Sequence, residues 1–299
     1  MLAKLYRSCV PASLRKQIYD LFLGEVMLSL RRFRRWSRGG FVLVFSPFFP
    51  KNDYYDAFRF VGRHGETSYP FFGSLKYRGI KAPIFHDDTN GLPYCFHHER
   101  KLFFPRAYND KYIQKVYRHL LIEQDKESPH RYFAEETTVK GKTLLDIGAA
   151  EGIFSLDHID DFDQIYLFEC EKEWIEALEA TFAPWKHKVE IVEVYVGGVD
   201  GEKTTTIDSF LQDKEKDQLY IKMDIEGAEP DALKGAEKLL QENQSVKLSV
   251  CLYHKQEDEQ IIMTYLTKQG YTCEVTTGYL YYQSAMRRAI CRAEKSIGE

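Results

Sequence analysis

Residues 143–152 read Thr-Leu-Leu-Asp-Ile-Gly-Ala-Ala-Glu-Gly, and this stretch decides the fold. A short apolar strand ends in Asp146, and Gly148 and Gly152 follow before residues 153–156, whose spacing predicts a helix. Glycine lets the chain turn sharply and allows a ligand to approach the backbone. We therefore predict a strand–turn–helix unit that binds a nucleotide-like ligand at the turn.

The charge of this turn indicates which kind of ligand fits. Dinucleotide sites hold an anionic pyrophosphate on a turn that reads G-x-G-x-x-G. Here the third glycine is absent, and the carboxylate of Asp146 would repel a pyrophosphate but would attract an ammonium group. S-adenosylmethionine carries an ammonium group and no phosphate. The turn residues Gly148, Ala149 and Gly152 are therefore predicted to bind S-adenosylmethionine, and a nicotinamide dinucleotide is the alternative.

The composition describes a globular protein with an unevenly charged sequence. The chain has 299 residues, of which 44% are hydrophobic and 29% charged, and its net charge of −4 argues against binding of nucleic acid by the whole chain. Residues 1–40 carry nine basic side chains against Asp20 and Glu25. This basic segment is predicted to be a helix with a solvated face. Peripheral contact with an anionic membrane surface is the alternative.

The cysteines and the hydropathy indicate the compartment. Six cysteines are scattered without a C-x-x-C pair, which favours a reducing, cytoplasmic environment. The most apolar candidate for a transmembrane helix, residues 18–30, is short and is interrupted by Asp20 and Glu25. We therefore expect no transmembrane segment.

The pattern along the chain predicts four parts. Residues 1–40 form a basic amphipathic helical segment, with a helix over 15–36. Residues 41–140, rich in Tyr, Phe, Pro and Gly, form an irregular accessory domain with a helix over 108–124. The ligand-binding domain spans 141–285, and a basic tail spans 286–299.

Strands and helices alternate regularly from residue 143 onward. This alternation predicts an α/β fold, a Rossmann-like doubly wound seven-stranded sheet with an antiparallel last strand, preceded by an α+β N-terminal region. Only three residues join the last two strands, so those two strands are expected to pair antiparallel. The predicted strands are Thr143–Ile147, Gln164–Phe168, Val189–Tyr195, Leu219–Met223, Val246–Leu252, Tyr271–Val275 and Tyr279–Tyr282, and the helices Ile153–His158, Glu173–Phe182, Thr206–Leu211, Pro230–Gln241 and Glu257–Gln269.

Acidic side chains follow the ends of the second and fourth strands. Glu169 ends the second strand, roughly 20 positions after Asp146, where an acid binds ribose hydroxyls in doubly wound folds. Lys222, Asp224 and Glu226 alternate at the end of the fourth strand and are expected on one face. Asp224 and Glu226 could hold a divalent metal, align an acceptor or accept its proton.

A histidine ends the fifth strand at the same edge of the sheet. His254 is a candidate proton acceptor, although a histidine hydrogen-bonded at a helix start is an equally good interpretation. The sequence leaves open which of Asp224, Glu226 or His254 acts as the base.

These motifs together resemble the FkbM-type methyltransferase family, within the class I, Rossmann-like methyltransferases. The resemblance covers under half of the chain, and it rests on Asp146–Ser155, Phe168-Glu169, Thr206–Phe210, Ile221–Glu229, Leu233–Ala236 and Tyr253-His254. It implies O-methylation of a sugar, a glycan or a secondary metabolite with S-adenosylmethionine as the cofactor. By the same resemblance, Asp146, Gly148 and Gly152 would line the methionine end of the cofactor and Glu169 would hold its ribose. Asp224, Glu226 and His254 would face the acceptor.

Two departures from the family pattern and one adjacent segment qualify this resemblance. Ala150-Glu151 stands where members often have Asn and a variable residue, and Cys170 stands where a Pro often follows the Glu. Residues 123–132 run directly toward the first strand, and we hypothesise that they fold over the cofactor edge.

An O-methyltransferase is therefore the predicted function, acting on a small-molecule or glycan acceptor. The alternatives are a nicotinamide-dependent oxidoreductase and a non-catalytic binding protein with a methyltransferase fold. The sequence does not name the acceptor, the oligomeric state or the role of residues 41–140.

Overall fold

The computed structural model describes residues 51–134 and 141–295. The predicted helix 15–36, the basic segment 1–40 and its membrane contact lie outside these residues. The chain divides into two compact units, residues 1–67 and 68–299. The described part of the first unit is helix α4 (Asp53–His64), which begins after Asn52, whose side chain accepts a hydrogen bond from the amide of Tyr55.

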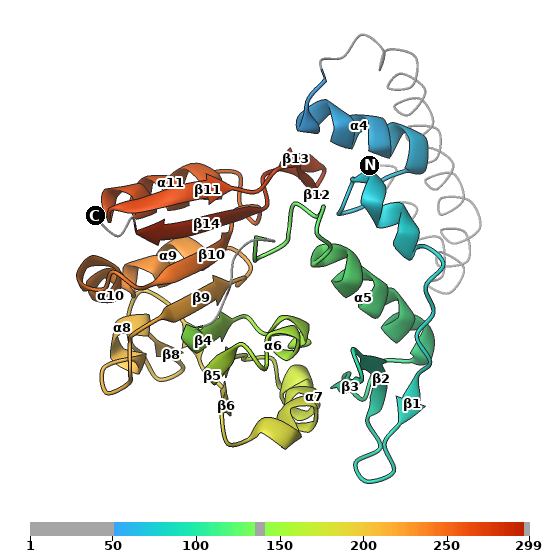
Figure 1. Cartoon of the computed structure of the whole chain (residues 1–299), viewed down its shortest axis with the longest axis horizontal. Coiled ribbons are helices and arrows are strands. Elements are labelled where there is room, and N and C mark those ends of the chain that lie inside the picture. Colours follow the sequence, from blue (N-terminus) through green and yellow to red (C-terminus); the bar gives the residue numbers. More distant parts are fainter. Residues whose placement is uncertain (1–50, 135–140, 296–299) are drawn as a thin grey trace, which may run out of the picture. The chain divides into compact units, whose positions relative to one another are not determined.

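The second unit is built on a seven-stranded sheet in the order β11-β14-β10-β9-β4-β5-β6 (Figure 1). Strands β6, β5, β4, β9 and β10 pair in parallel, and β14 pairs antiparallel with both β10 and β11. This arrangement confirms the predicted Rossmann-like sheet. The strands are β4 (Gly141–Ile147), β5 (Phe162–Phe168), β6 (Val189–Val192), β9 (Leu219–Met223), β10 (Lys247–Cys251), β11 (Tyr271–Val275) and β14 (Ile290–Lys295).

Apolar cores cover both faces of this sheet because alternate strand residues point to opposite sides. Leu144 packs in the core that includes α6 (Ile153–Asp157) and α7 (Lys172–Phe182). Its neighbour Leu145 packs in the core on the other face. The helices of that second core are α8 (Ile207–Phe210), α9 (Glu229–Lys234), α10 (Glu237–Glu242) and α11 (Asp258–Lys268).

The C-terminal region differs from the prediction. The segment expected to pair with 271–275 instead forms a hairpin of β12 (Leu280–Tyr282) and β13 (Ala285–Arg287). Residues 290–295, expected in a basic tail, form the antiparallel strand β14 between β10 and β11. The tail prediction is wrong for these residues because Ile290, Cys291 and Ala293 are buried in the sheet.

The single helix predicted over 230–241 is two helices, α9 and α10. Gly235 separates them, and a Cβ there would lie only 2.1 Å from the carbonyl oxygen of Gly197. The carboxylate of Asp208 then accepts hydrogen bonds from the amides of Lys238 and Leu239 and so caps α10. Two short strands, β7 (Tyr195–Val196) and β8 (Thr204–Thr205), pair nearby in sequence.

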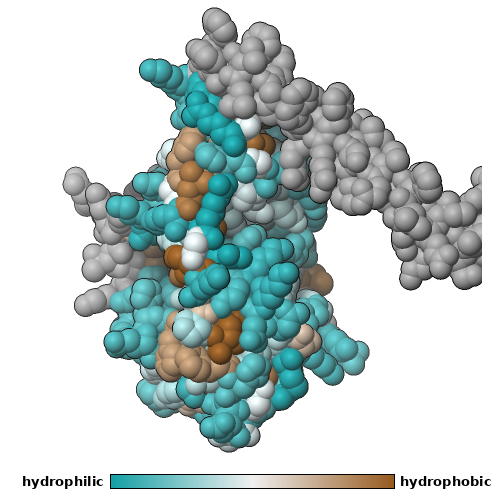
Figure 2. Space-filling model, turned by 90° about the vertical axis from the view of Figure 1, so that its right-hand side faces the viewer, coloured by the Kyte–Doolittle hydropathy of each residue, from teal (hydrophilic) through white to brown (hydrophobic). Residues whose placement is uncertain are grey.

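The accessory part of the second unit precedes the sheet. It contains a 3₁₀ helix (Phe72–Tyr77), the three-stranded sheet of β1 (Phe85–His86), β2 (Pro93–His97) and β3 (Arg100–Phe103), and α5 (Asp110–Glu123). The face that includes these strands is largely hydrophilic, with small apolar patches (Figure 2). Helix α5 confirms the helix predicted over 108–124. None of the described helices has the length and apolar character needed to cross a membrane.

Candidate active site

The turn after β4 is built around two glycines in the left-handed region. Gly148 has a φ of +80° and Gly152 a φ of +72°. A Cβ on Gly148 would lie 1.9 Å from the carbonyl oxygen of Asp224, and one on Gly152 would lie 2.7 Å from Cδ2 of Leu178. Ala149, the third predicted turn contact, is buried. The turn therefore packs directly on the backbone that follows β9.

A buried ion pair supports this turn. Asp146 is fully buried; its Oδ2 accepts a hydrogen bond from Ser155 at 2.6 Å, and its Oδ1 lies 2.9 Å from Nζ of Lys222. The same ammonium donates to the carbonyl oxygen of Gly148. Burial lowers the pKa of Lys222, but the carboxylates of Asp146 and Asp224 raise it by more. The pKa therefore lies above its usual value, and the lysine stays charged. The sequence predicted that Asp146 attracts an ammonium group, and in the structure that group belongs to Lys222.

Glu169 lies beside the same turn, after β5. Its Oε2 accepts a hydrogen bond from the amide of Ala150 at 2.9 Å. Its Oε1 accepts from the amides of Cys170 and Glu171 at 2.7 and 2.9 Å. A carboxylate has about four acceptor positions, so these three bonds orient Glu169 and leave capacity for one ribose hydroxyl. Its contact with a ribose remains a prediction.

Asp224 is the centre of a polar cluster after β9. Tyr132 donates a hydrogen bond to its Oδ2 at 2.8 Å, Tyr253 donates to its Oδ1 at 3.3 Å, and Nε2 of His254 lies 3.3 Å from Oδ1. Burial raises the pKa of Asp224, but Lys222 and the histidines outweigh burial and hold it below its usual range. Its side chain remains 18% exposed, so Asp224 is an ionised carboxylate that a ligand can reach.

His254 is held between two carboxylates. Its Nδ1 lies 2.8 Å from Oε1 of Glu229, which is fully buried and also accepts a hydrogen bond from the amide of Ile225. Burial lowers the pKa of His254, but Glu229 and then Asp224 raise it above its usual value. The sequence analysis assigned no role to Glu229. The feature that could have indicated one is its position as the last acidic residue of the motif at 221–229.

Glu226 departs from the alternation that the sequence predicted. Strand β9 ends at Met223, and Glu226 adopts a φ of +55° in the turn that follows. Its side chain is 85% exposed, and Oε2 lies 3.7 Å from Nε2 of His254. Lys222 points back to Asp146 instead of sharing a face with Glu226. Both carboxylates therefore lie near Nε2 of His254, Asp224 on its buried side and Glu226 on its exposed side.

The accessory segment before β4 reaches into this cluster. His130 is fully buried, with Nε2 3.2 Å from the Tyr253 hydroxyl and 3.7 Å from Oδ2 of Asp224. Its Nδ1 lies 3.1 Å from Oε1 of Glu123, at the end of α5. Tyr132, in the same segment, adds its hydrogen bond to Asp224. His130 and Tyr132 thus contact Asp224 directly, and the hypothesis that residues 123–132 fold over the cofactor edge stays a prediction.

The contact between Glu123 and His130 predicts a pH-dependent stability. Burial, with Asp224 and Glu151, raises the pKa of Glu123 from 4.5 to about 8. Burial, with Lys222 and His254, lowers the pKa of His130 from 6.5 to about 4. The folded pair therefore holds one proton between about pH 4 and 8. Because the unfolded pair loses its last proton near pH 6.5, stability should fall between pH 6.5 and 8, by up to about 1.4 kcal/mol per pH unit.

Urea unfolding at pH 6.5 and pH 8 measures this effect. Glu123→Gln removes the group that takes up the proton on folding, so the variant should lose less stability over this interval than the unmodified chain. Equal losses in both proteins would show that this pair does not carry the proton.

Negative charge accumulates around the glycine turn. Glu151, the unusual residue of the turn, is half-buried. Burial raises its pKa to about 7, and Glu169 and Asp224 also raise it, although Lys222 lowers it. The site therefore favours a cationic ligand over an anionic one.

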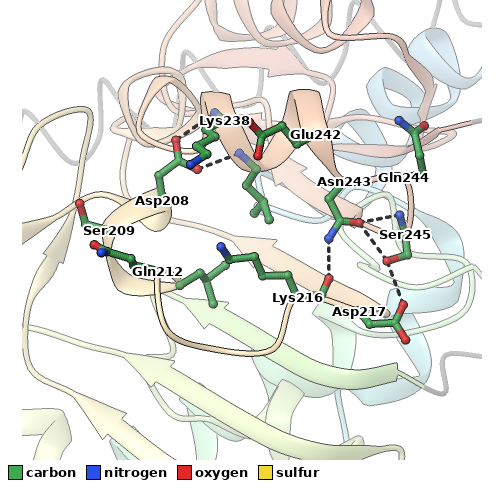
Figure 3. Close-up of a pocket in the computed structure, with 12 residues that line it drawn as sticks. Asp208, Ser209, Gln212, Lys216, Asp217, Lys238, Glu242, Asn243, Gln244 and Ser245 are labelled. Carbon is green, nitrogen blue, oxygen red and sulfur yellow. Dashed lines mark hydrogen bonds between the residues drawn. The ribbon is translucent and has the colours of Figure 1, made fainter.

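A hollow on the molecule lies at the other end of the strands. Its lining includes Asp208 on α8, Lys238 on α10, and Lys216 and Ser245, which precede β9 and β10 (Figure 3). Ligands of open parallel sheets bind outside the carboxyl ends of the strands. The hollow lies at the amino ends, so it is not part of the candidate active site.

Among the described residues, two groups with metal-ligand chemistry include Asp224. One adds His130 and Cys251, and the other adds Glu229 and His254. Glu226 belongs to neither group, so the geometry gives no support to the predicted pairing of Asp224 and Glu226 around an ion.

Comparisons with known proteins found one family model that matches part of this region. Residues 197–273 match the model described as the methyltransferase FkbM domain. This range contains Asp224, Glu229 and His254, whereas the glycine turn precedes it. A comparison with curated proteins found no match.

Several solved methyltransferase structures are similar to part of this chain. A methyltransferase FkbM from Methylobacillus flagellatus aligns with a TM-score of 0.42 and 19% identity over 52% of this chain and 44% of that chain. A precorrin-6y C5,15-methyltransferase from Geobacter metallireducens gives 0.37 and 14% over 53% and 83%. M. capricolum TrmK in complex with S-adenosyl-homocysteine gives 0.36 and 9% over 52% and 62%. Residues 197–273 are therefore similar to the methyltransferase FkbM domain, the family that the sequence motifs resemble.

Proposed function

We propose that this chain is a methyltransferase that uses S-adenosylmethionine and methylates a hydroxyl of a sugar, a glycan or a secondary metabolite. The observation that carries the proposal is the packing of the glycine turn on the backbone of Asp224. This packing sets the backbone of Asp224 against the turn. A methyl donor on the turn and a hydroxyl on Asp224 would lie next to each other, as direct transfer requires.

The charges of the site support a sulfonium cofactor. Burial raises the pKa of Glu151, and the nearby carboxylates of Glu169 and Asp224 add to that rise, although Lys222 opposes it. A ligand with sulfonium and ammonium groups would relieve the repulsion between these carboxylates, whereas a pyrophosphate would increase it. When bound, S-adenosylmethionine supplies a methyl group on a positively charged sulfur.

Asp224 orients the acceptor hydroxyl and takes its proton. Tyr132, Tyr253 and His254 fix the carboxylate, and Glu229 fixes His254 in turn. As the oxygen–carbon bond forms and the carbon–sulfur bond breaks, the hydroxyl proton becomes strongly acidic. A carboxylate with a lowered pKa is therefore basic enough to accept it. His254 and Glu226 border the acceptor, with His254 as the positioning residue.

A labelled transfer assay tests the proposal. The full chain is incubated with methyl-labelled cofactor and a panel of glycans and hydroxylated metabolites, with and without a chelator. We expect labelled methyl ethers. Label on nitrogen or carbon would contradict hydroxyl transfer, and absence of any transfer would favour a binding protein. Loss of transfer with chelator, restored by Mg²⁺, would show a metal requirement.

The acceptor class, the cytoplasmic location and the absence of a nucleic-acid partner remain predictions. The free cysteines of the described residues, among them buried Cys95, Cys251 and Cys291, support a reducing compartment.

A further inference from the structure

A group of side chains outside the proposed active site has the ligand chemistry of a metal centre. His97 ends β2, His98 follows it, and Asp157 ends α6. One ligand atom from each lies within 4.8 Å of the others. Nε2 of His97 lies 2.6 Å, and Nε2 of His98 4.0 Å, from the same Oδ1 of Asp157. We propose that these three side chains bind a divalent transition-metal ion, with zinc as the best match and water completing the coordination.

The buried histidine is oriented as a metal ligand requires. His97 is almost fully buried, and its Nδ1 lies 3.0 Å from the hydroxyl of Tyr117 on α5. A metal-bound histidine usually donates its other ring N–H to such a partner, which fixes the tautomer and the ring orientation. Tyr117 thus directs Nε2 of His97 toward Asp157.

The second histidine supplies an accessible ligand. His98 and Glu99 form the two-residue turn between β2 and β3, with φ values of +46° and +67°. Hairpins of this length favour these left-handed conformations. The turn sets the His98 ring next to His97, with centroids 4.3 Å apart. The His98 side chain is 75% exposed, so it can rotate onto an ion that arrives from solvent.

Arg100 attaches the hairpin to the end of α6. Arg100 donates hydrogen bonds to the carbonyl oxygen of Leu156 at 2.8 Å and to Asp160 at 2.5 Å. Asp157, Asp160 and Asp161 therefore give this end of the helix an excess of negative charge over Arg100. An ion would join the accessory hairpin to α6, the helix that starts directly after Gly152. We expect it to stabilise that connection.

Calorimetric titration of zinc chloride into the metal-free full chain tests the proposal. We expect one zinc ion per chain with micromolar affinity, and a thermal unfolding midpoint that rises with zinc. His98→Ala and Asp157→Asn should each weaken binding about 10-fold or more, and Tyr117→Phe, which removes one hydroxyl, about 10-fold. His98 is largely exposed, so its variant should keep the unfolding midpoint of the zinc-free chain.

Two controls locate the ion. His86→Ala removes an exposed histidine from β1 of the same sheet and should leave zinc binding unchanged. His254→Ala should also leave it unchanged, because it alters only the cluster around Asp224. Absence of zinc binding, or binding that survives His98→Ala and disappears in His254→Ala, would overturn the proposal. Neither result would bear on methyl transfer.

Discussion

Asp224→Asn is expected to lower kcat for methyl transfer by about 10²- to 10⁴-fold, the usual contribution of a positioned proton acceptor. Asparagine keeps the size of the side chain. A carbonyl oxygen in the place of Oδ2 still accepts the hydrogen bond of Tyr132 and lies 3.4 Å from the hydroxyl of Tyr253. The variant should therefore fold and bind S-adenosylhomocysteine almost as the unmodified chain does. It lacks the basic oxygen that takes the proton from the acceptor.

Steady-state kinetics and a cofactor titration on the same preparations separate the two effects. Asp231→Asn is the matched control, since Asp231 lies on α9 with a 62% exposed side chain and pairs with Lys234. It should keep full activity. If Asp224→Asn retained kcat within a few-fold of the unmodified chain, Asp224 would not be the proton acceptor, and His254 or Glu226 would have to be tested in its place.

Lys222→Met is expected to cost about 3–5 kcal/mol of unfolding free energy, because it leaves one partner of a buried ion pair alone. Asp146 is fully buried, and Lys222 is the partner of its Oδ1 at 2.9 Å. The same substitution removes the hydrogen bond to the carbonyl oxygen of Gly148. The glycine turn should therefore loosen, and the affinity for S-adenosylhomocysteine should fall together with the stability.

Urea unfolding and a double-mutant cycle measure how much the ion pair of Asp146 and Lys222 contributes to the free energy of unfolding. Lys234→Met removes an exposed lysine from an ion pair on α9 and should change stability by less than about 1 kcal/mol. Adding Asp146→Asn to Lys222→Met removes the unpaired buried charge and should recover part of the loss. A loss in Lys222→Met no larger than in Lys234→Met would mean that the buried pair does not hold the turn.

Local sequence patterns were enough to predict those strands that consist of a single apolar run. β9 and β11 have the predicted bounds because each run is bordered by polar or turn residues. β14 was missed because Arg292 and Lys295 give residues 290–295 a basic, polar appearance. The cause of its burial is long-range: β14 pairs with β10 and β11 on both sides. A single segment does not show which neighbours will cover it.

The candidate site also contains residues that the sequence could place and residues that it could not. The ends of parallel strands meet at one edge, so the sequence could bring Asp146, Glu169, Asp224 and His254 together. It could not show that Lys222 neutralises Asp146, because that pairing depends on the register of β4 and β9. Nor could it place Tyr132, which lies 92 positions from Asp224 along the chain. Glu226 was misplaced because strand alternation does not continue past the end of β9.

Calorimetric titration of the full chain with S-adenosylhomocysteine, and separately with NAD, tests the central claim most directly. We expect one site for S-adenosylhomocysteine. Glu169→Gln should weaken binding, because it replaces the carboxylate that accepts from the amide of Ala150 and that we propose to accept from the ribose. We expect no binding of NAD, whose pyrophosphate would face Glu151 and Asp224. Binding of NAD without binding of S-adenosylhomocysteine would contradict the central claim.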